Sequence, residues 1–71
     1  MLKTSEKIRI LVDRKNTSIT EMADKIGTTR QNLSNKLKRN NFNENDLLKI
    51  ADVLDQELIL SFRDKENGDI L

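Results

Sequence analysis

The sequence predicts a mainly α-helical domain of four helices followed by a C-terminal β-hairpin. Two observations predict it: apolar residues recur every three or four positions through residues 5–54, whereas they alternate in residues 57–62. A chain of 71 residues has room for one small domain. We therefore expect a single domain over residues 1–71, with a helical core at 5–55 and the hairpin at 56–71.

The first and fourth helices are predicted from their apolar faces and their N-caps. The first covers about residues 5–15, and Thr4 or Ser5 is a suitable N-cap. Asn43 is a suitable N-cap for the fourth helix. Acidic residues follow in the first turn, where the helix dipole favours negative charge. The most apolar helical face of the chain then consists of Leu47, Leu48, Ile50, Ala51 and Leu54.

Two short helices are expected between them. Ser18 and Glu21 form a predicted capping box, in which the Ser18 hydroxyl accepts the Glu21 N–H and the Glu21 carboxylate accepts the Ser18 N–H. Gly27 follows where a helix ends with a positive φ. Thr29 is placed to cap a third helix over about residues 30–38.

The third helix is unusually polar. Leu33 and Leu37 are its only strongly apolar residues, so it can bury only a narrow seam. A small residue, Ala23, permits a close helix crossing four residues before Gly27, and Leu33 lies six residues after that glycine. This spacing is typical of a helix-turn-helix, in which the second helix presents its polar face outward.

Charge is unevenly distributed along the chain. Residues 1–39 hold ten basic and four acidic residues, and residues 40–71 hold three basic and eight acidic residues, so that the total is +1. A cationic half that faces a polyanion explains this asymmetry. Two solvated helix faces without a ligand explain it equally well.

Composition excludes several function classes. The chain has no Cys and no His, which removes disulfides, thiolate metal sites and the commonest general base. Only two Phe and no Tyr or Trp are present, which disfavours RNA readers that stack bases on aromatic platforms. We expect no enzyme activity, no cofactor, no metal and no membrane association, and a cytoplasmic location.

The segment Ile19–Leu33 (ITEMADKIGTTRQNL) resembles the helix-turn-helix motif of the phage repressor/Cro (Xre-type) DNA-binding family. The resemblance extends over about Glu6–Leu54 and implies a lambda-repressor-like fold. Some family members have a fifth helix, where this chain has the predicted hairpin. The chain departs from the family pattern at Lys36-Leu37, where many members have an aliphatic residue followed by Glu.

The resemblance also implies site residues on double-stranded DNA. Side chains at the positions that read bases in the family are Arg30, Gln31, Ser34 and Asn35. Arg can bind guanine O6 and N7, and Gln and Asn can bind adenine N6 and N7. Residues implied to contact phosphates are Thr17, Ser18, Thr29, Lys36, Lys38, Arg39 and Asn40. Taken singly, the cations Arg30, Lys36, Lys38 and Arg39 are better explained as side chains that keep an exposed helix soluble, and Gln31 and Asn35 as ordinary surface amides.

The predicted hairpin bears on assembly. Its apolar residues Leu58, Leu60, Phe62, Ile70 and Leu71 are core residues by default. The alternative is a sheet between subunits, with Leu58, Leu60, Phe62 and Ile70 as dimerisation candidates, because a lone hairpin is marginal in water and its edges favour pairing. A homodimer is expected, since one helix-turn-helix reads only a few base pairs.

We therefore expect a sequence-specific, DNA-binding transcriptional regulator that inserts helix 30–38 into the major groove. Repression by occupying a promoter is the expected mode, with activation as the alternative. A function of another class is a protein-interaction module, such as an antitoxin or adaptor, that uses the same fold and its acidic C-terminal half.

Overall fold

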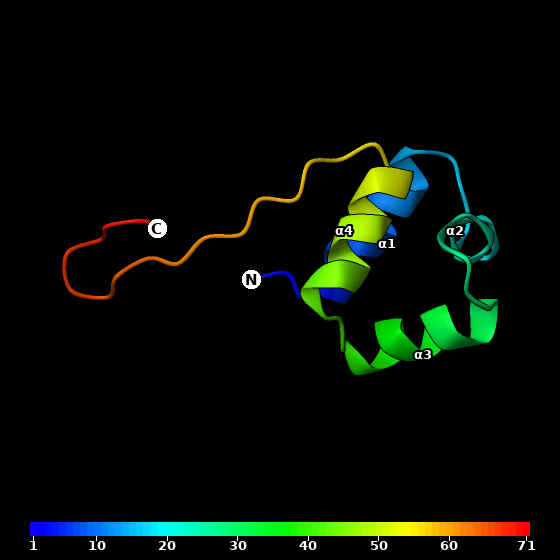
Figure 1. Ribbon diagram of the computed structural model, residues 1–71, viewed down its shortest axis with the longest axis horizontal. Helices are drawn as coiled ribbons and strands as arrows, with labels where there is room; N and C mark the ends of the chain where they lie inside the picture. The colour runs from blue at the N-terminus through cyan, green and yellow to red at the C-terminus, as the bar shows by residue number, and fades with distance from the viewer.

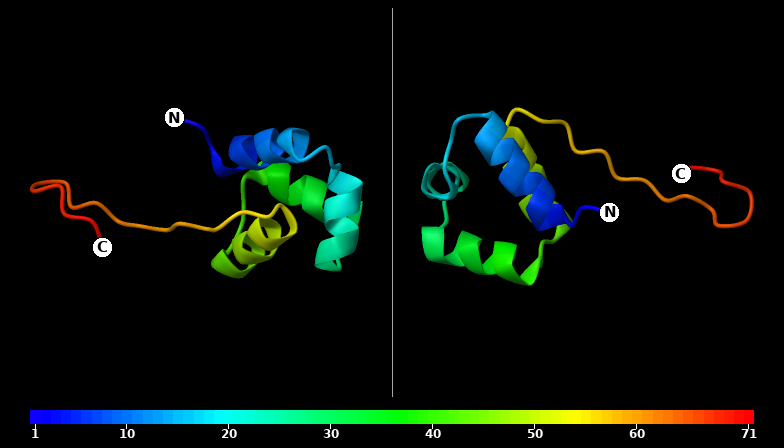
Figure 2. Two further views of the ribbon diagram at one scale, coloured as in Figure 1. Left: turned by 90° about the horizontal axis from the view of Figure 1, so that it is seen from above. Right: turned by 180° about the vertical axis from the view of Figure 1, so that it is seen from behind.

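The computed structural model describes all 71 residues, of which the packed part is a bundle of four helices. As Figure 1 shows, α1 spans Thr4–Arg14, α2 Ile19–Ile26, α3 Arg30–Arg39 and α4 Glu44–Val53. Residues 56–71, the C-terminal tail, extend away from the helices in every view (Figures 1 and 2), and the molecule is 43 Å long. None of the four helices combines the length and apolar character needed to cross a membrane.

α2 is the helix against which α3 and α4 pack. It contacts both α3 and α4, and its Met22 side chain is completely buried. Ala23 is buried beside it, because only a small side chain permits close helix packing at this point. In Figure 1, α2 is seen end-on while α3 runs across the view, so these two helices meet at a steep angle. The helix-turn-helix predicted from the sequence is present.

The core is small and draws on every helix. Its eight buried apolar side chains are Ile8, Val12, Met22, Ala23, Leu33, Leu37, Ile50 and Leu54. Phe42, from the loop between α3 and α4, is half-buried and packs against this cluster. The expected apolar face of α4 is correct only in part, because Leu48 is exposed. Leu48 lies outside the stripe through Leu47, Ile50 and Leu54, which faces the core.

Local hydrogen bonds define the starts of α2, α3 and α4 as expected, with one change, whereas the expected α1 N-cap, Thr4 or Ser5, is wrong. The Ser18, Thr29 and Asn43 side chains each accept a backbone N–H from the residue three positions later, at 3.1, 3.1 and 2.7 Å. Asn43 forms a complete capping box, since its own N–H donates to the Asp46 carboxylate at 3.1 Å. The Ser18 box is only half formed, because the Glu21 carboxylate accepts the Thr17 hydroxyl at 2.9 Å and not the Ser18 N–H. A capping side chain was therefore correctly predicted at each of these three helix starts.

α1 begins one residue earlier than expected, and Ser5 has a different role. The N-cap is Lys3, whose N–H donates to the Glu6 carboxylate at 3.2 Å. Ser5 is buried, and its hydroxyl donates to the Leu37 carbonyl oxygen at 2.6 Å. Asn40 Oδ1 accepts the Ser5 N–H at 2.9 Å and lies 3.0 Å from the Ser5 hydroxyl oxygen. These contacts link the start of α1 to the end of α3.

The predicted C-terminal β-hairpin is wrong as a secondary-structure element. The tail contains no β-strand, only one isolated antiparallel bridge between Arg63 and Ile70. The turn itself forms, with Gly68 at φ +79° and the Phe62 and Leu71 backbones exchanging two hydrogen bonds. Nothing packs on either face of this short pairing, and an isolated two-stranded hairpin gains too little burial to be stable. The tail is therefore a loop with a hairpin-like tip.

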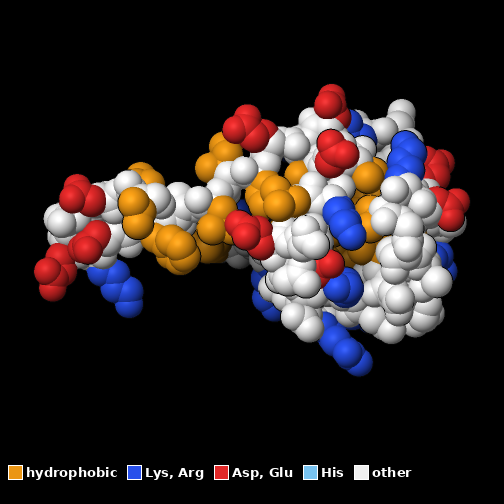
Figure 3. All heavy atoms as spheres, viewed as in Figure 1, with side chains coloured by type: hydrophobic (Ala, Val, Ile, Leu, Met, Phe, Trp, Pro, Cys, Tyr) orange, Lys and Arg blue, Asp and Glu red, His pale blue; other side chains and the backbone are white.

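The apolar tail residues are also not core residues, contrary to the default expectation. Leu60, Phe62 and Ile70 are 54%, 71% and 62% exposed, and Leu71 is almost fully exposed. Leu58 alone is half-buried, at one end of an apolar groove of about 180 Å³ between α1 and α4. In Figure 3, orange side chains continue from the helical body along the tail. Unpartnered apolar surface of this kind is typical of a contact site.

We predict that the turn at Gly27 limits the stability of the helical body. Gly27 has φ +88° and nothing lies within 4 Å of where a Cβ would be, so Gly27→Ala introduces backbone strain without a clash. An L-residue in this conformation costs about 1–2 kcal/mol in the free energy of unfolding. Urea denaturation followed by circular dichroism measures this loss.

The matched control is Gly68→Ala, which introduces the same strain at φ +79° in the tail. Because the tip of the tail around Gly68 is exposed and does not pack against the core, this variant should leave the unfolding midpoint of the helices unchanged. Equal losses for the two variants would contradict the special role of the Gly27 turn.

Candidate nucleic-acid interface

The outer face of α3 is the most polar helical surface of the molecule. Leu33 and Leu37 are its only buried residues, and both point into the core. The other eight residues are polar or basic, and none of them is buried. In Figure 3 the surface over α3 is mostly white and blue, the colours of polar and cationic side chains. α3 is thus anchored to the core by Leu33 and Leu37, and its opposite face is exposed to solvent.

The four predicted base-reading residues lie on this face within the first six residues of α3. Arg30 is exposed and forms no ion pair with any carboxylate of the chain. Gln31 Nε2 donates to Asn35 Oδ1 at 3.2 Å, so these two amides lie side by side one turn apart. Ser34 and Asn35 are half-buried. The structure therefore pairs two amides one turn apart, and it leaves the Arg30 guanidinium exposed at the start of the same helix.

The predicted phosphate contacts fall into three groups. Lys38 and Arg39 are exposed in the last turn of α3, and neither forms an ion pair. Their position favours the helix itself, because positive charge near a helix C-terminus is stabilising. They are therefore cations that an external anion can reach without displacing an internal carboxylate.

The second group consists of hydroxyl and amide residues with internal partners. Thr17 donates its hydroxyl to Glu21, which places a carboxylate at the N-terminus of α2. The Ser18 and Thr29 oxygens cap α2 and α3, and Asn40 Oδ1 accepts from Ser5. Each of these residues therefore has a structural role within the chain. The contact between Asn40 and Ser5 was not predicted from the sequence. Phosphate contact by them stays a prediction.

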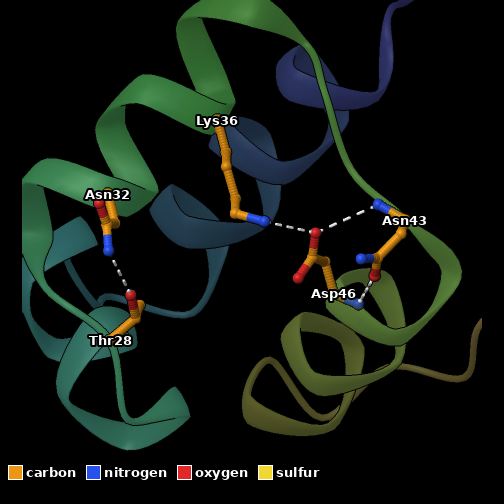
Figure 4. A network of polar contacts seen from close by, with 5 residues as sticks. All are labelled: Thr28, Asn32, Lys36, Asn43 and Asp46. Atoms are coloured by element: carbon orange, nitrogen blue, oxygen red, sulfur yellow. Dashed lines mark hydrogen bonds and ion pairs between the residues drawn. The ribbon is translucent and has the colours of Figure 1, made fainter.

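Lys36 is the third case, because its ammonium is already paired. Lys36 Nζ lies 2.7 Å from Asp46 Oδ2, and the same oxygen accepts the Asn43 N–H at 3.1 Å (Figure 4). The hydrogen bond from Lys36 lowers the pKa of Asp46, and the Asn43 N–H lowers it further. The pair joins α3 to the first turn of α4.

A polar hollow next to the predicted residues was not anticipated from the sequence. It has a volume of about 240 Å³ and no apolar lining, and its walls are Asn32, Asn35, Lys36, Arg39 and Asn41. Asn32 and Asn41 are the two members that the sequence did not single out. Figure 4 shows Asn32 beside Thr28, to whose hydroxyl it donates at 3.4 Å. The signal was available for Asn32, since residues 32, 35, 36 and 39 follow the spacing of one helical face.

One comparison with known proteins agrees with this geometry. A family model described as a Cro/C1-type HTH DNA-binding domain matches residues 7–58. The match covers all of α2, α3 and α4 and most of α1. No curated protein and no solved structure matches the chain.

We predict that the Lys36–Asp46 pair makes stability depend on pH on the acid side. The pKa of Asp46 is lowered from 3.8 in the folded state, so its charged form stabilises the fold above pH 3.8, and this contribution is lost as the pH falls through the folded-state value. Asp46→Asn removes the contribution. The stability difference between wild type and this variant should be constant near neutral pH and shrink below about pH 4.

Urea denaturation at a series of pH values measures this difference. Lys36→Met, which removes the main cause of the lowered pKa, should reduce the acid-side loss as well. A difference between wild type and Asp46→Asn that grows on acidification would contradict the prediction.

Proposed function

Because the chain belongs to the Cro/C1-type helix-turn-helix DNA-binding domain family, we propose that it regulates transcription by inserting α3 into the major groove of a specific operator. The observation that carries the proposal is the open polar face of α3, which is supported from beneath by Leu33 and Leu37. A helix held in this way fits the major groove, which admits one α-helix.

Base recognition is assigned to Arg30, Gln31, Ser34 and Asn35 of α3. Arg30 is suited to guanine, because its guanidinium has no internal carboxylate partner and can donate to O6 and N7. Gln31 and Asn35 are suited to adenine, and their mutual hydrogen bond keeps both amides on the outer face. Ser34, one turn after Arg30, is compatible with any base.

Affinity is assigned to the cations at the end of α3. Lys38 and Arg39 are exposed and unpaired, so binding a phosphate releases counterions without breaking an internal contact. The acidic tail extends away from the helices (Figure 2), and this keeps its negative charge from covering the helical body. We propose repression by occupancy of a promoter in the cytoplasm, without catalysis or a cofactor.

The tail supports a homodimer. Leu60, Phe62 and Ile70 are exposed in the single chain, and burying them against a second copy gains apolar free energy. The groove between α1 and α4 accepts Leu58 at one end, so it provides an apolar surface that continues into the tail. A dimer places two recognition helices on one duplex, about one helical turn of DNA apart. The intersubunit sheet, which the sequence offered as an alternative to core packing, stays a prediction.

The same exposed tail favours a second candidate function, capture of a different protein. An antitoxin or adaptor would present Phe62 and Ile70 to its partner and not to a second copy. Substitutions in the tail distinguish the two functions. They should weaken operator binding if the tail holds a homodimer together, and leave it unchanged if the tail binds a different protein.

We predict that DNA binding depends steeply on salt through α3. For Lys38→Ala/Arg39→Ala, the plot of log affinity against log salt on a random-sequence duplex should flatten by about 1–2 units. Fluorescence anisotropy at several salt concentrations measures the slope. The matched control Lys7→Ala/Arg9→Ala removes one Lys and one Arg from the exposed surface of α1 and should leave it unchanged.

The same proposal separates specificity from affinity. Arg30→Ala should relax base preference at one operator position, as measured by selection from a randomised duplex library, since one bidentate contact discriminates by about 1–3 kcal/mol. Absence of duplex binding by the wild-type chain at low salt would sink the proposal.

We predict that the tail holds the dimer together. Leu60→Asp/Phe62→Asp should convert the protein to a monomer, because two charges replace apolar surface at the contact. Light scattering coupled to size-exclusion chromatography measures the mass. Leu48→Asp is the control, since Leu48 is 51% exposed, as Leu60 is 54% exposed, but lies on α4 and outside the groove. A monomeric wild type at tens of micromolar would refute the dimer.

A further inference from the structure

We propose that Asp46 restrains the DNA affinity of this protein by holding the ammonium of Lys36 in an intramolecular ion pair. The inference rests on the proposed function, because it concerns the same face of α3. Asp46 lies on α4 and is not one of the predicted DNA contacts. Its ion pair keeps the Lys36 ammonium from binding a phosphate.

The geometry of the pair is well defined. Lys36 Nζ is 2.7 Å from Asp46 Oδ2, and the Asp46 side chain is three-quarters covered while that of Lys36 is 41% exposed. The second hydrogen bond to Asp46 Oδ2, from the Asn43 N–H, fixes the carboxylate at the capping position of α4. The carboxylate is therefore the rigid partner, and the lysine is the flexible one.

Lys36 lies at the border of two hollows. On one side is a hollow of about 220 Å³ whose walls include Asp46 and Lys49. On the other side is the polar hollow with Asn32 and Arg39, which has no carboxylate. The Lys36 side chain lines both hollows, and its ion pair with Asp46 holds the ammonium in the first of them.

The charges explain why the pair matters for DNA. Asp46 cancels the Lys36 charge next to the unpaired cations Lys38 and Arg39. Without Asp46, Lys36 becomes a further free cation on the helix that carries the proposed contacts, and Lys49 loses a nearby negative charge. A cation that neutralises one more phosphate steepens the salt dependence of binding by about 0.9 units.

Four variants test the proposal on a random-sequence duplex by fluorescence anisotropy. Asp46→Asn keeps the side-chain shape and should steepen the salt slope by about one unit, equivalent to an extra three- to fourfold loss of affinity between about 50 and 200 mM salt. Lys36→Met alone should leave the slope unchanged. Asp46→Asn/Lys36→Met should return to the wild-type slope, because the released cation is then absent.

Glu44→Gln is the matched control. It removes one negative charge from the same first turn of α4, and Glu44 forms no ion pair with a lysine or arginine. Its slope should equal that of wild type. Thermal unfolding of each variant checks that all are folded at the assay temperature.

The outcomes separate this inference from the function on which it rests. Wild type that fails to bind the duplex overturns the proposed function, and the inference with it. If wild type binds, equal effects of Asp46→Asn and Glu44→Gln overturn the inference alone, since charge and not the ion pair is then responsible. A slope that falls by one unit in Lys36→Met also overturns it, because Lys36 is then already in contact with phosphate.

Discussion

Burial of Met22 and Ala23 between α2 and its neighbours holds the two helices that flank the Gly27 turn at a steep angle. Both side chains are at most 2% exposed, and α2 contacts α3 and α4 directly. The angle leaves α3 with only Leu33 and Leu37 directed inward. Since the core contains only eight buried apolar residues, the loss of any one of these contacts removes a large share of what positions α3.

Polar contacts complete what this small core cannot supply. Ser5 connects the start of α1 to Leu37 and Asn40 at the end of α3, with its hydroxyl buried and satisfied. Every buried side-chain nitrogen and oxygen in the structure has a hydrogen-bond partner. A buried hydrogen bond contributes less than the cost of leaving its groups unpaired, so such contacts determine position more than they add stability.

The basic residues of α3 divide into two classes by their partners. Arg30, Lys38 and Arg39 have no internal carboxylate, whereas Lys36 is paired with Asp46 on the neighbouring helix. Residue type alone does not distinguish the classes, because all four follow the same pattern of basic side chains on a polar helix. The division follows from the approach of the α4 N-terminus to one side of α3 (Figure 4).

Local sequence was sufficient to predict the four helices, the N-caps Ser18, Thr29 and Asn43 of α2, α3 and α4, and the left-handed turn at Gly27. These features depend on residues within about four positions of each other, so hydrogen-bond chemistry and apolar spacing are sufficient to predict them. The identity of α3 as the polar outer helix was likewise evident from its two leucines.

Which side chains of α3 stay unpaired depends on contacts between residues that are distant along the chain. The Ser5–Asn40 contact spans 35 positions and the Lys36–Asp46 contact spans 10, and neither has a local signal. The tail shows the same limit, because its alternating apolar residues fit a strand while Leu60, Phe62 and Ile70 are left exposed. Burial depends on what the rest of the fold brings close, and a pattern of neighbours along the chain does not contain that information.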